Sequence, residues 1–312
     1  MILVCGEALI DIFVGEETHD HIGMDGRFGG SPFYVAFGLA RMGQKAEFLT
    51  GLSNDLIGRR LYRFLREEGV GERFLRRSNR PSTLSIVDLS VKSAPLYAFY
   101  GEGAADRDIR IGDIAPLPDT IRALHFGSFS TVVEPVGAAL EALAKRESDA
   151  RLIAYDPNVR PTIEADMEVW RRKVETMVGY AHVLKISDED FDLLYGDTDH
   201  AAMARTWLAR NVRLVVLTRG GKGVLAWNRA HHLDIAAPEI KLVDSVGAGD
   251  TFQAGLLTAL SETGNLTSAA LDAISLSALT ACLNFAAVAA AITCSRRGAD
   301  IPRRHELPAQ IV

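Results

Sequence analysis

Cysteine is scarce in this sequence, with three residues among 312. Cys5, Cys282 and Cys294 are odd in number and lack the spacing of metal ligands, which favours reduced thiols over a disulfide framework. The N-terminal residues carry no basic flank of the kind that opens a signal peptide. We therefore expect a cytoplasmic protein that needs neither disulfides nor a structural metal to fold.

The chain also lacks a charge excess that would suit a polyanionic partner. Lys and Arg total 34 and Asp and Glu total 40, which gives a formal net charge of −6 without a long run of one sign. This balance argues against nucleic acid or an anionic membrane as the main partner. The Ala-rich apolar stretch at residues 278–294 is short for a membrane span and contains Asn284, so it predicts a buried helix.

Two common nucleotide-binding signatures are missing. No Gly-x-x-x-x-Gly-Lys-Ser/Thr loop occurs in the chain, and no Gly-x-Gly-x-x-Gly follows the first apolar segment. The first absence argues against a Walker A site. The second makes a dinucleotide-dependent dehydrogenase a distant alternative.

The order of apolar and amphipathic segments predicts an α/β fold. Short apolar runs predict buried parallel strands at residues 2–4, 46–49, 123–126, 152–155, 182–186 and 214–217. Helical patterns lie between them at residues 31–42, 56–68, 136–145, 167–178 and 201–209. This alternation predicts a central, mostly parallel sheet covered by helices on both faces, in other words a three-layer sandwich.

Two stretches break the alternation. Residues 11–30 and 83–101 resemble paired strands without a following helix, so we expect them to form a small β lid, although an edge extension of the main sheet would give the same pattern. The length fits a single domain over residues 1–312 with this lid attached.

The sharpest local signal is the segment 243–252, which reads Val-Asp-Ser-Val-Gly-Ala-Gly-Asp-Thr-Phe and runs into an apolar helical pattern. Gly247, Ala248 and Gly249 allow the backbone to approach a ligand closely. The start of a helix binds anions through its free N–H groups and its dipole. Asp250 would lie in the first turn, where an ionised carboxylate can accept a proton. A glycine turn in which Asp250 merely caps the helix is the structural alternative.

A second signal is Gly29-Gly30-Ser31-Pro32 before a helical pattern that reaches Met42. The glycines permit close approach of a ligand, and Pro32 suits a first helical turn. A well-capped helix with no ligand is the alternative interpretation.

These two segments, in this order and at this separation, resemble the two signature motifs of the ribokinase (PfkB) family of sugar kinases. Other segments agree along the whole chain, and they are the stretches at residues 6–11, 51–58, 156–160 and 218–223. Within the family the chain is most similar to bacterial fructokinases, because of the segments Tyr97 to Arg107 and Lys185 to Asp190.

The resemblance implies a ribokinase-like fold and an ATP-dependent kinase that moves the γ-phosphate to a sugar hydroxyl. It assigns catalysis to Asp250 as base, with Gly247, Ala248 and Gly249 as the anion hole. It assigns the sugar to Asp11, Gly29, Gly30, Ser31, Tyr34 and Arg160. It assigns the nucleotide and the water shell of Mg²⁺ to Lys185, Ser187, Asp190, Thr218, Gly220, Gly221 and Gly223. It also implies a K⁺ site at Asp244, Val246 and Gly298, and a homodimer formed through the lid.

Three positions depart from the family pattern. Tyr34 stands where the family usually has an Asn that contacts the sugar, and Ala287 stands where many members have an Asn near the adenine. The Asn-x-x-Glu motif is replaced by Ser187-Asp188-Glu189-Asp190, a form associated with fructokinases. The sequence therefore predicts a kinase that converts fructose to fructose 6-phosphate. Its alternatives are a family kinase for 2-keto-3-deoxygluconate, ribose or a nucleoside, and a non-catalytic regulator that binds a sugar or nucleotide.

Overall fold

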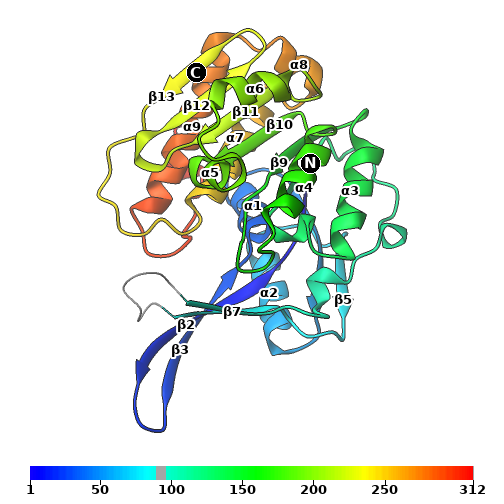
Figure 1. The fold of residues 1–312 in the computed structure, drawn as a ribbon, viewed down its shortest axis with the longest axis vertical. Coiled ribbons are helices and arrows are strands. Elements are labelled where there is room, and N and C mark those ends of the chain that lie inside the picture. The colour runs from blue at the N-terminus through cyan, green and yellow to red at the C-terminus, as the bar shows by residue number, and fades with distance from the viewer. Residues whose placement is uncertain (89–95, 312) are drawn as a thin grey trace.

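A nine-stranded sheet runs through the centre of the computed structural model, which describes residues 1–88 and 96–311 (Figure 1). In spatial order its strands are β13 (His232–Ile235), β12 (Val224–Asn228), β11 (Leu214–Thr218), β10 (Val183–Ser187), β9 (Leu152–Asp156), β8 (Ala123–Gly127), β1 (Ile2–Cys5), β4 (Ala46–Ser53) and β5 (Leu75–Ser78). Neighbouring strands from β11 to β5 are parallel, whereas β12 and β13 add an antiparallel edge. All six strands predicted from apolar runs are confirmed.

The central strands are apolar because both of their faces are covered. Every residue of β1, β8 and β9 is buried. Polar side chains appear where the strands end, with Asp156 closing β9, Ser187 closing β10 and Thr218 closing β11. Because parallel strands all end at one edge of the sheet, this edge is where a ligand site is expected.

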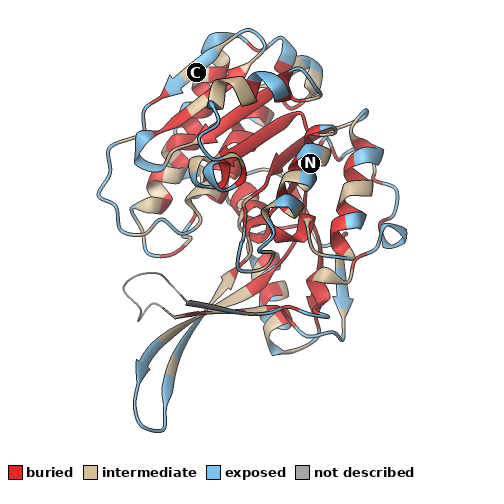
Figure 2. Cartoon of the chain, in the orientation of Figure 1, coloured by how far each residue is buried: buried red, intermediate tan, exposed pale blue. Residues whose placement is uncertain are grey.

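Helices cover the sheet on both faces, as Figure 2 shows by their buried inner sides. One apolar core lies under α1 (Ser31–Arg41), α2 (Leu56–Glu67), α7 (Ala248–Glu262), α8 (Ser268–Asp272) and α9 (Leu276–Cys294). The other lies under α3 (Val136–Glu147), α4 (Met167–Val178), α5 (Asp188–Tyr195) and α6 (His200–Leu208). This arrangement confirms the predicted α/β sandwich.

Helix α9 is long and apolar enough, by length and composition, to cross a membrane. In this structure it packs along α7, and residues such as Leu279, Leu283 and Phe285 belong to the core. The prediction of a buried helix at this position is therefore confirmed.

A second sheet of four strands projects from the carboxyl edge of the first (Figure 1). Its strands, in spatial order, are β3 (Ile22–Gly29), β2 (Leu9–Glu17), β6 (Leu84–Asp88) and β7 (Leu96–Tyr100). Residues 89–95, which were predicted to belong to the same region, lie outside the described residues. Asp11 is the register partner of both Arg27 and Ser85, so these three side chains share one face of the second sheet.

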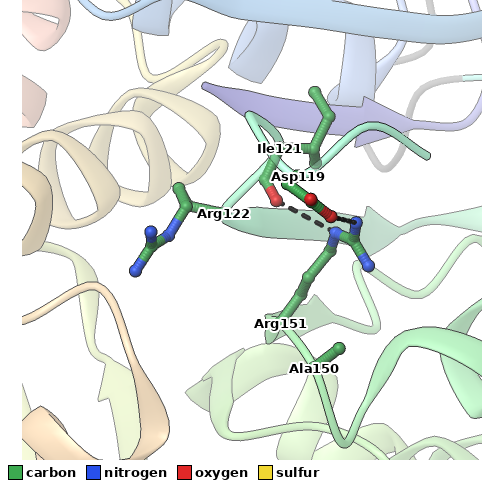
Figure 3. Close-up of a pocket in the computed structure, with 5 residues that line it drawn as sticks. All are labelled: Asp119, Ile121, Arg122, Ala150 and Arg151. Atoms are coloured by element: carbon green, nitrogen blue, oxygen red, sulfur yellow. Dashed lines mark hydrogen bonds and ion pairs between the residues drawn. The ribbon is translucent and has the colours of Figure 1, made fainter.

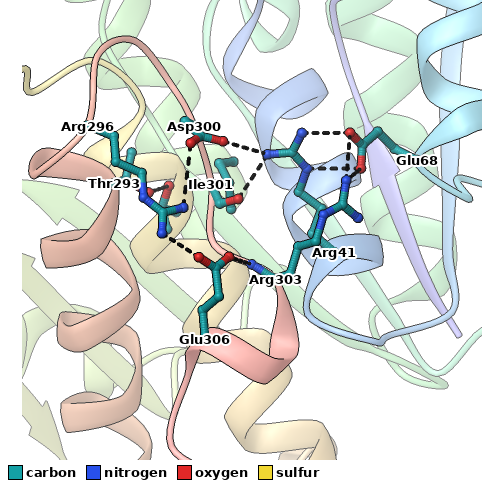
Figure 4. A network of polar contacts seen from close by, with 9 residues as sticks. Arg41, Glu68, Thr293, Arg296, Asp300, Ile301, Arg303 and Glu306 are labelled. Carbon is teal, nitrogen blue, oxygen red and sulfur yellow. Dashed lines mark hydrogen bonds and ion pairs between the residues drawn. The ribbon is translucent and has the colours of Figure 1, made fainter.

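A network of ion pairs joins the ends of α1 and α2 to the segment after α9 (Figure 4). Arg41 binds Glu68, with 2.6 Å between Nη2 and Oε1, and also Asp300, with 3.2 Å between Nη1 and Oδ1. Arg296 in turn contacts Asp300 and Glu306. The network fixes the loop after α9 against the helix that begins at the Gly29–Gly30 turn.

Candidate active site

Asp250 lies at the meeting point of three elements. It is the third residue of α7, and its Oδ1 accepts hydrogen bonds from the Ser31 hydroxyl at 2.6 Å and from Asn158 Nδ2 at 3.2 Å. Asn158 Nδ2 also lies 2.8 Å from Ser31 Oγ. The start of α1, the start of α7 and the loop after β9 therefore converge on one carboxylate.

The environment of Asp250 suits a group that exchanges a proton near neutrality. Burial raises the pKa of this carboxyl to about 6, against the opposing effects of the Ser31 hydrogen bond and of the Lys185 charge. Asp156 adds a further, smaller rise, while Arg160 lowers the pKa. A carboxyl with this pKa is mostly ionised at pH 7 and can act as a general base.

The turn before Asp250 presents the start of α7 to the site. Gly247 has a φ of 75°, a left-handed conformation that favours glycine, and a β-carbon there would lie 2.6 Å from the Ala299 side chain. The first amides of a helix have no partner within the helix, so they can hold an anion. The Ala248 amide donates to the Ser245 carbonyl at 3.2 Å, so of the three predicted anion-hole residues this one already has a partner.

The predicted sugar residues gather around the turn before α1. Gly30 has a φ of 109°, and a β-carbon on Gly29 would lie 2.3 Å from Asp11 Oδ2. Burial raises the pKa of Asp11, although a hydrogen bond from Ser85 and the charge of Arg160 oppose that rise. Asp11 and Arg160 therefore lie near each other and near the Gly29–Gly30 turn.

Tyr34 points its hydroxyl at the protein backbone. The phenol donates to the Phe28 carbonyl on β3 at 2.5 Å, and its ring contacts the rings of Phe33 and Phe37. Tyr34 also lines a cavity of about 530 Å³ that contacts Asp11, Val246 and Gly298. Tyr34 thus borders the predicted sugar region.

The predicted nucleotide residues follow the ends of β10 and β11. Ser187 and Thr218 are register partners, and Gly220, Gly221 and Gly223 follow directly in the next turn. Ser187 caps α5 by accepting the Asp190 amide at 3.0 Å. Asp190 is buried and accepts the Val159 amide at 3.0 Å, which ties α5 to the loop that carries Asn158.

Lys185 is set apart from these residues by its burial. Its side chain is 3% exposed and its Nζ lies 2.7 Å from Asp156 Oδ2, which is 1% exposed. A β-carbon on Gly249 would lie 3.0 Å from the same Nζ. The ammonium therefore lies directly beneath the first turn of α7.

The residues predicted to surround a monovalent cation are held together by Asp244. Its Oδ2 accepts the Gly298 amide at 2.8 Å and its Oδ1 accepts the Val246 amide at 3.1 Å. The Gly298 carbonyl accepts the Asp300 amide at 2.9 Å. Among the described residues, no group of three His, Cys, Asp or Glu side chains could hold a metal ion.

Sequence reasoning missed two residues of this constellation. Asn158 binds both Ser31 and Asp250, and Asp156 pairs with Lys185, yet neither was assigned a role. Asp156 ends a buried strand and Asn158 follows it by two residues, and this position at a carboxyl end is the signal that could have identified them. Asn158 also has a φ of 42°, which only the three-dimensional structure reveals.

A second cavity, of about 290 Å³, lies away from these residues (Figure 3). Its lining consists of Asp119, Ile121, Arg122, Ala150 and Arg151. The Arg151 guanidinium donates to the Ile121 carbonyl at 2.9 Å and so fills part of this site with an internal contact. None of the residues predicted to bind substrate or nucleotide lines this cavity.

Comparison with known proteins points to one family. Residues 1–306 match the family described as pfkB family carbohydrate kinase. The chain is 38% identical over 260 residues to the fructokinase of Rhizobium leguminosarum bv. trifolii, an alignment that covers 83% of this chain and 79% of that protein.

Solved structures agree on the fold. Fructokinase from Xylella fastidiosa with bound ATP superposes with a TM-score of 0.88 at 24% identity, covering 98% of this chain and 96% of that one. Fructokinase from Vibrio cholerae O395, in a form with bound fructose, ADP and calcium ion, gives a TM-score of 0.79 at 24% identity, covering 96% and 94%. These likenesses confirm the predicted ribokinase-like architecture.

Proposed function

The chain belongs to the pfkB family of carbohydrate kinases and is an ATP-dependent sugar kinase, and we propose that its sugar is fructose, converted to fructose 6-phosphate. The fructokinase with 38% identity supports this choice of substrate. The segment from Tyr97 to Arg107 and the Ser187–Asp190 variant, both of fructokinase type, favour the same substrate.

The observation that carries the proposal is the environment of Asp250. Its carboxylate is buried, accepts hydrogen bonds from Ser31 and Asn158, and lies at the start of α7. In the proposed reaction Asp250 takes the proton of the attacking sugar hydroxyl, and the amides at the Gly247–Gly249 turn stabilise charge on the transferred phosphoryl group. Such a reaction asks the protein mainly for positioning and charge stabilisation, and the contacts of Asp250 support this assignment.

The sugar would lie between Asp11, the Gly29–Gly30 turn and Asp250. Asp11 accepts hydrogen bonds from sugar hydroxyls, and Arg160 donates to the ring or to a hydroxyl. Ser31 orients the base through its bond to Asp250. The four-stranded sheet acts as the lid of a single domain spanning residues 1–312, and its Asp11 face excludes water when the sugar is bound.

The nucleotide would occupy the ends of β10 and β11. Thr218, Gly220, Gly221 and Gly223 would cradle ATP, because their turn leaves open space at Gly220 and Gly221. The Xylella fastidiosa and Vibrio cholerae fructokinases bind ATP, or ADP with calcium ion, which supports a nucleotide with a divalent metal. We propose Mg²⁺ for this chain, held through waters that Ser187 and Asp190 orient, since Mg²⁺ retains much of its hydration shell.

A monovalent cation fits the loop region beside the Gly247–Gly249 turn. Asp244 provides one carboxylate, and the backbone oxygens of Val246 and Gly298 lie in the two segments that it joins. Carboxylate and carbonyl oxygens suit hard cations, and the resemblance to the family favours K⁺. When bound, K⁺ would add positive charge next to the anion hole.

The outer face of the lid supports a homodimer. Ile12, Val14 and Met24 share this face, because Val14 pairs with Met24 in the register of β2 and β3, and Met24 is 58% exposed. An apolar sheet face of this kind is stabilised by covering it with a second copy. We place the protein in the cytoplasm, where ATP and reduced thiols are available.

The test of the proposal is a coupled assay of ADP release across fructose, ribose, glucose, a nucleoside and 2-keto-3-deoxygluconate. We expect fructose to give the highest kcat/KM. If ribose or the keto-deoxy acid is better by tenfold, about 1.4 kcal/mol of transition-state binding, the substrate assignment is wrong and the kinase assignment remains. If no ADP is released with any of these sugars while nucleotide and sugar still bind, the non-catalytic regulator is favoured instead.

A further inference from the structure

A buried ion pair lies under the catalytic turn. Lys185 is the third residue of β10 and Asp156 the last of β9, and their Nζ and Oδ2 atoms are 2.7 Å apart. Neither side chain reaches the surface, since Lys185 is 3% and Asp156 is 1% exposed. The pair therefore belongs to the interior of the carboxyl edge.

Burial of such a pair has a cost that hydrophobic residues would avoid. Removing two charges from water costs several kcal/mol per ion, and a well-packed apolar pair is often as stable or more stable. Asp156 Oδ1 is also buried without a hydrogen-bond partner in the structure. A costly pair with an incompletely bonded carboxylate is therefore more readily explained by function than by stability.

The position of the ammonium indicates what that function is. A β-carbon on Gly249 would lie 3.0 Å from Lys185 Nζ, so the charge lies against the backbone of the proposed anion hole. The next residue is Asp250, whose carboxylate is electrostatically coupled to Lys185. In a site with little water, a fixed charge has a far larger effect on a neighbouring carboxylate than it would in solvent.

Groups on several elements face Asp250 and must be counted with Lys185. Asp156 comes from β9, Arg160 from the loop that follows it, and Tyr34 from α1. The two cations, Lys185 and Arg160, favour the ionised carboxylate, whereas Asp156 opposes it. Asp156 itself stabilises the charged form of Lys185, and burial alone would have lowered the pKa of that ammonium.

We propose that Lys185 is an electrostatic positioning residue, whose buried ammonium keeps Asp250 ionised and adds positive charge beneath the Gly247–Gly249 turn, rather than a ligand of the nucleotide. Asp156 holds the ammonium in place through its contact of 2.7 Å with Nζ. The inference rests on the proposed role of Asp250 and adds the residues that lie behind it, Lys185 and Asp156. It also gives Gly249 a reason to be glycine, since a side chain there would displace the ammonium.

The test compares three variants with the wild-type protein at saturating ATP, Mg²⁺ and sugar. Lys185→Met removes the charge and keeps the length of the side chain, Asp156→Asn removes the opposing charge, and the double variant removes both. The measurements are the acid limb of the pH profile of kcat and the Kd of ADP by calorimetry. Turnover by the wild-type protein tests the proposed function, whereas the difference in acid limb between wild type and variants tests the role of Lys185. Failure of the proposed function can therefore be told apart from failure of this inference.

In Lys185→Met we expect kcat to fall by about 10²-fold and the acid limb to shift to higher pH by about one unit. Asp156→Asn should shift the acid limb to lower pH, and the acid limb of the double variant should lie between those of wild type and Lys185→Met. The Kd of ADP should change by less than about threefold in each. If Lys185→Met does not fold, the double variant, which leaves no unpaired buried charge, decides the matter.

Two results would overturn the proposal. A tenfold weaker ADP affinity with an unmoved limb would identify Lys185 as a nucleotide ligand. A uniform loss of kcat at all pH values, with a lower Tm and an unmoved limb, would identify the pair as purely structural.

Discussion

Tyr34 uses its single hydroxyl donor within the protein. Its bond to the Phe28 carbonyl on β3 is 2.5 Å long, and Tyr34 also lines the cavity that contacts Asp11. The Asn expected at this position could both donate to and accept from a sugar hydroxyl. We therefore expect Tyr34 to act on the substrate by its volume, while its hydrogen bond joins α1 to β3.

A pair of variants separates these two effects. Tyr34→Phe removes only the hydrogen bond, so we expect a loss of about 1 kcal/mol in stability with the order of sugars unchanged. Tyr34→Asn opens space and adds an amide, so we expect the relative kcat/KM values for fructose, ribose and glucose to change by about tenfold or more. Kinetics and thermal unfolding of both proteins provide the measurement, and an altered order of sugars in Tyr34→Phe would contradict this account.

Glu7 illustrates the energetic cost of a polar group near the site. Burial raises the pKa of this carboxyl to about 7, and its Oε2 has no hydrogen-bond partner in the structure. A carboxyl whose pKa is raised by folding contributes stability below its ordinary pKa of 4.5 and loses that contribution as the pH rises through about 7. At pH 8 the folded protein therefore holds an unfavourable buried charge.

From this sign we predict that Glu7→Gln raises Tm at pH 8, by an amount that corresponds to at most about 3 kcal/mol. The gain should shrink as the pH falls from 8 to 5, because the wild-type carboxyl then becomes protonated. Calorimetric scans of both proteins at several pH values measure the difference. A stabilisation that is the same at pH 5 and pH 8 would show that charge is not its cause.

At the scale of elements, the loops before α7 and after α9 act as one unit. Asp244 joins them through the Val246 and Gly298 amides, and the ion pairs of Arg41 hold the second loop to α1 and α2 (Figure 4). A cation bound between these loops would therefore influence the Gly247–Gly249 turn directly.

Replacing K⁺ by a bulky organic cation at constant ionic strength should lower kcat several-fold, on the order of tenfold. Asp244→Asn should remove most of the dependence on K⁺, while Asp300→Asn, which alters a neighbouring charge outside the proposed oxygen set, should retain it. Steady-state rates across a wide range of K⁺ concentrations provide the readout. A flat response in the wild-type protein would remove the cation from the account and leave the kinase assignment intact.

The lid is an element whose two faces differ in chemistry. Asp11 and Arg27 lie on the face toward the site, and Ile12, Val14 and Met24 lie on the outer face. We expect Met24→Glu to convert a dimer to a monomer, because a charge at the centre of an apolar interface is costly to bury. His19→Glu, at the exposed tip of the same hairpin, should leave the dimer intact.

Light scattering coupled to size exclusion gives the mass of both variants and of the wild-type protein. A wild-type protein that is monomeric at micromolar concentration would contradict the proposed dimer. A dimer that persists in Met24→Glu would show that another surface forms it.

At the scale of the whole molecule, elements with a clear pattern of apolar residues were predicted well. Helix α4 has the predicted bounds, Met167–Val178, because Asp166 caps an amphipathic run. Helix α5 was missed, since Asp188–Tyr195 begins with three acidic residues that in sequence suggest a solvent-exposed turn. The antiparallel strands β12 and β13 were missed because their short, mixed composition depends on pairing with β11.

Only those site residues that belong to a local sequence motif could be predicted from the sequence. Asp250 and its glycines lie in one continuous segment, so their chemistry could be inferred from their order along the chain. The Lys185–Asp156 pair depends on β9 and β10 lying side by side, and the contacts of Asn158 depend on the starts of α1 and α7 meeting the loop after β9, which no single segment encodes. The hydrogen bond from Tyr34 to Phe28 likewise requires the lid and α1 to be positioned in space.

The central claim is that Asp250 is the base of a sugar kinase, and the most direct test is kcat for fructose phosphorylation in the wild-type protein and in Asp250→Asn. The substitution keeps the shape of the side chain and can retain a hydrogen bond with Ser31, but it removes the proton acceptor. We predict a loss of kcat of about 10²–10⁴-fold with a sugar Kd that changes little. Near-normal kcat in a correctly folded Asp250→Asn protein would contradict the account.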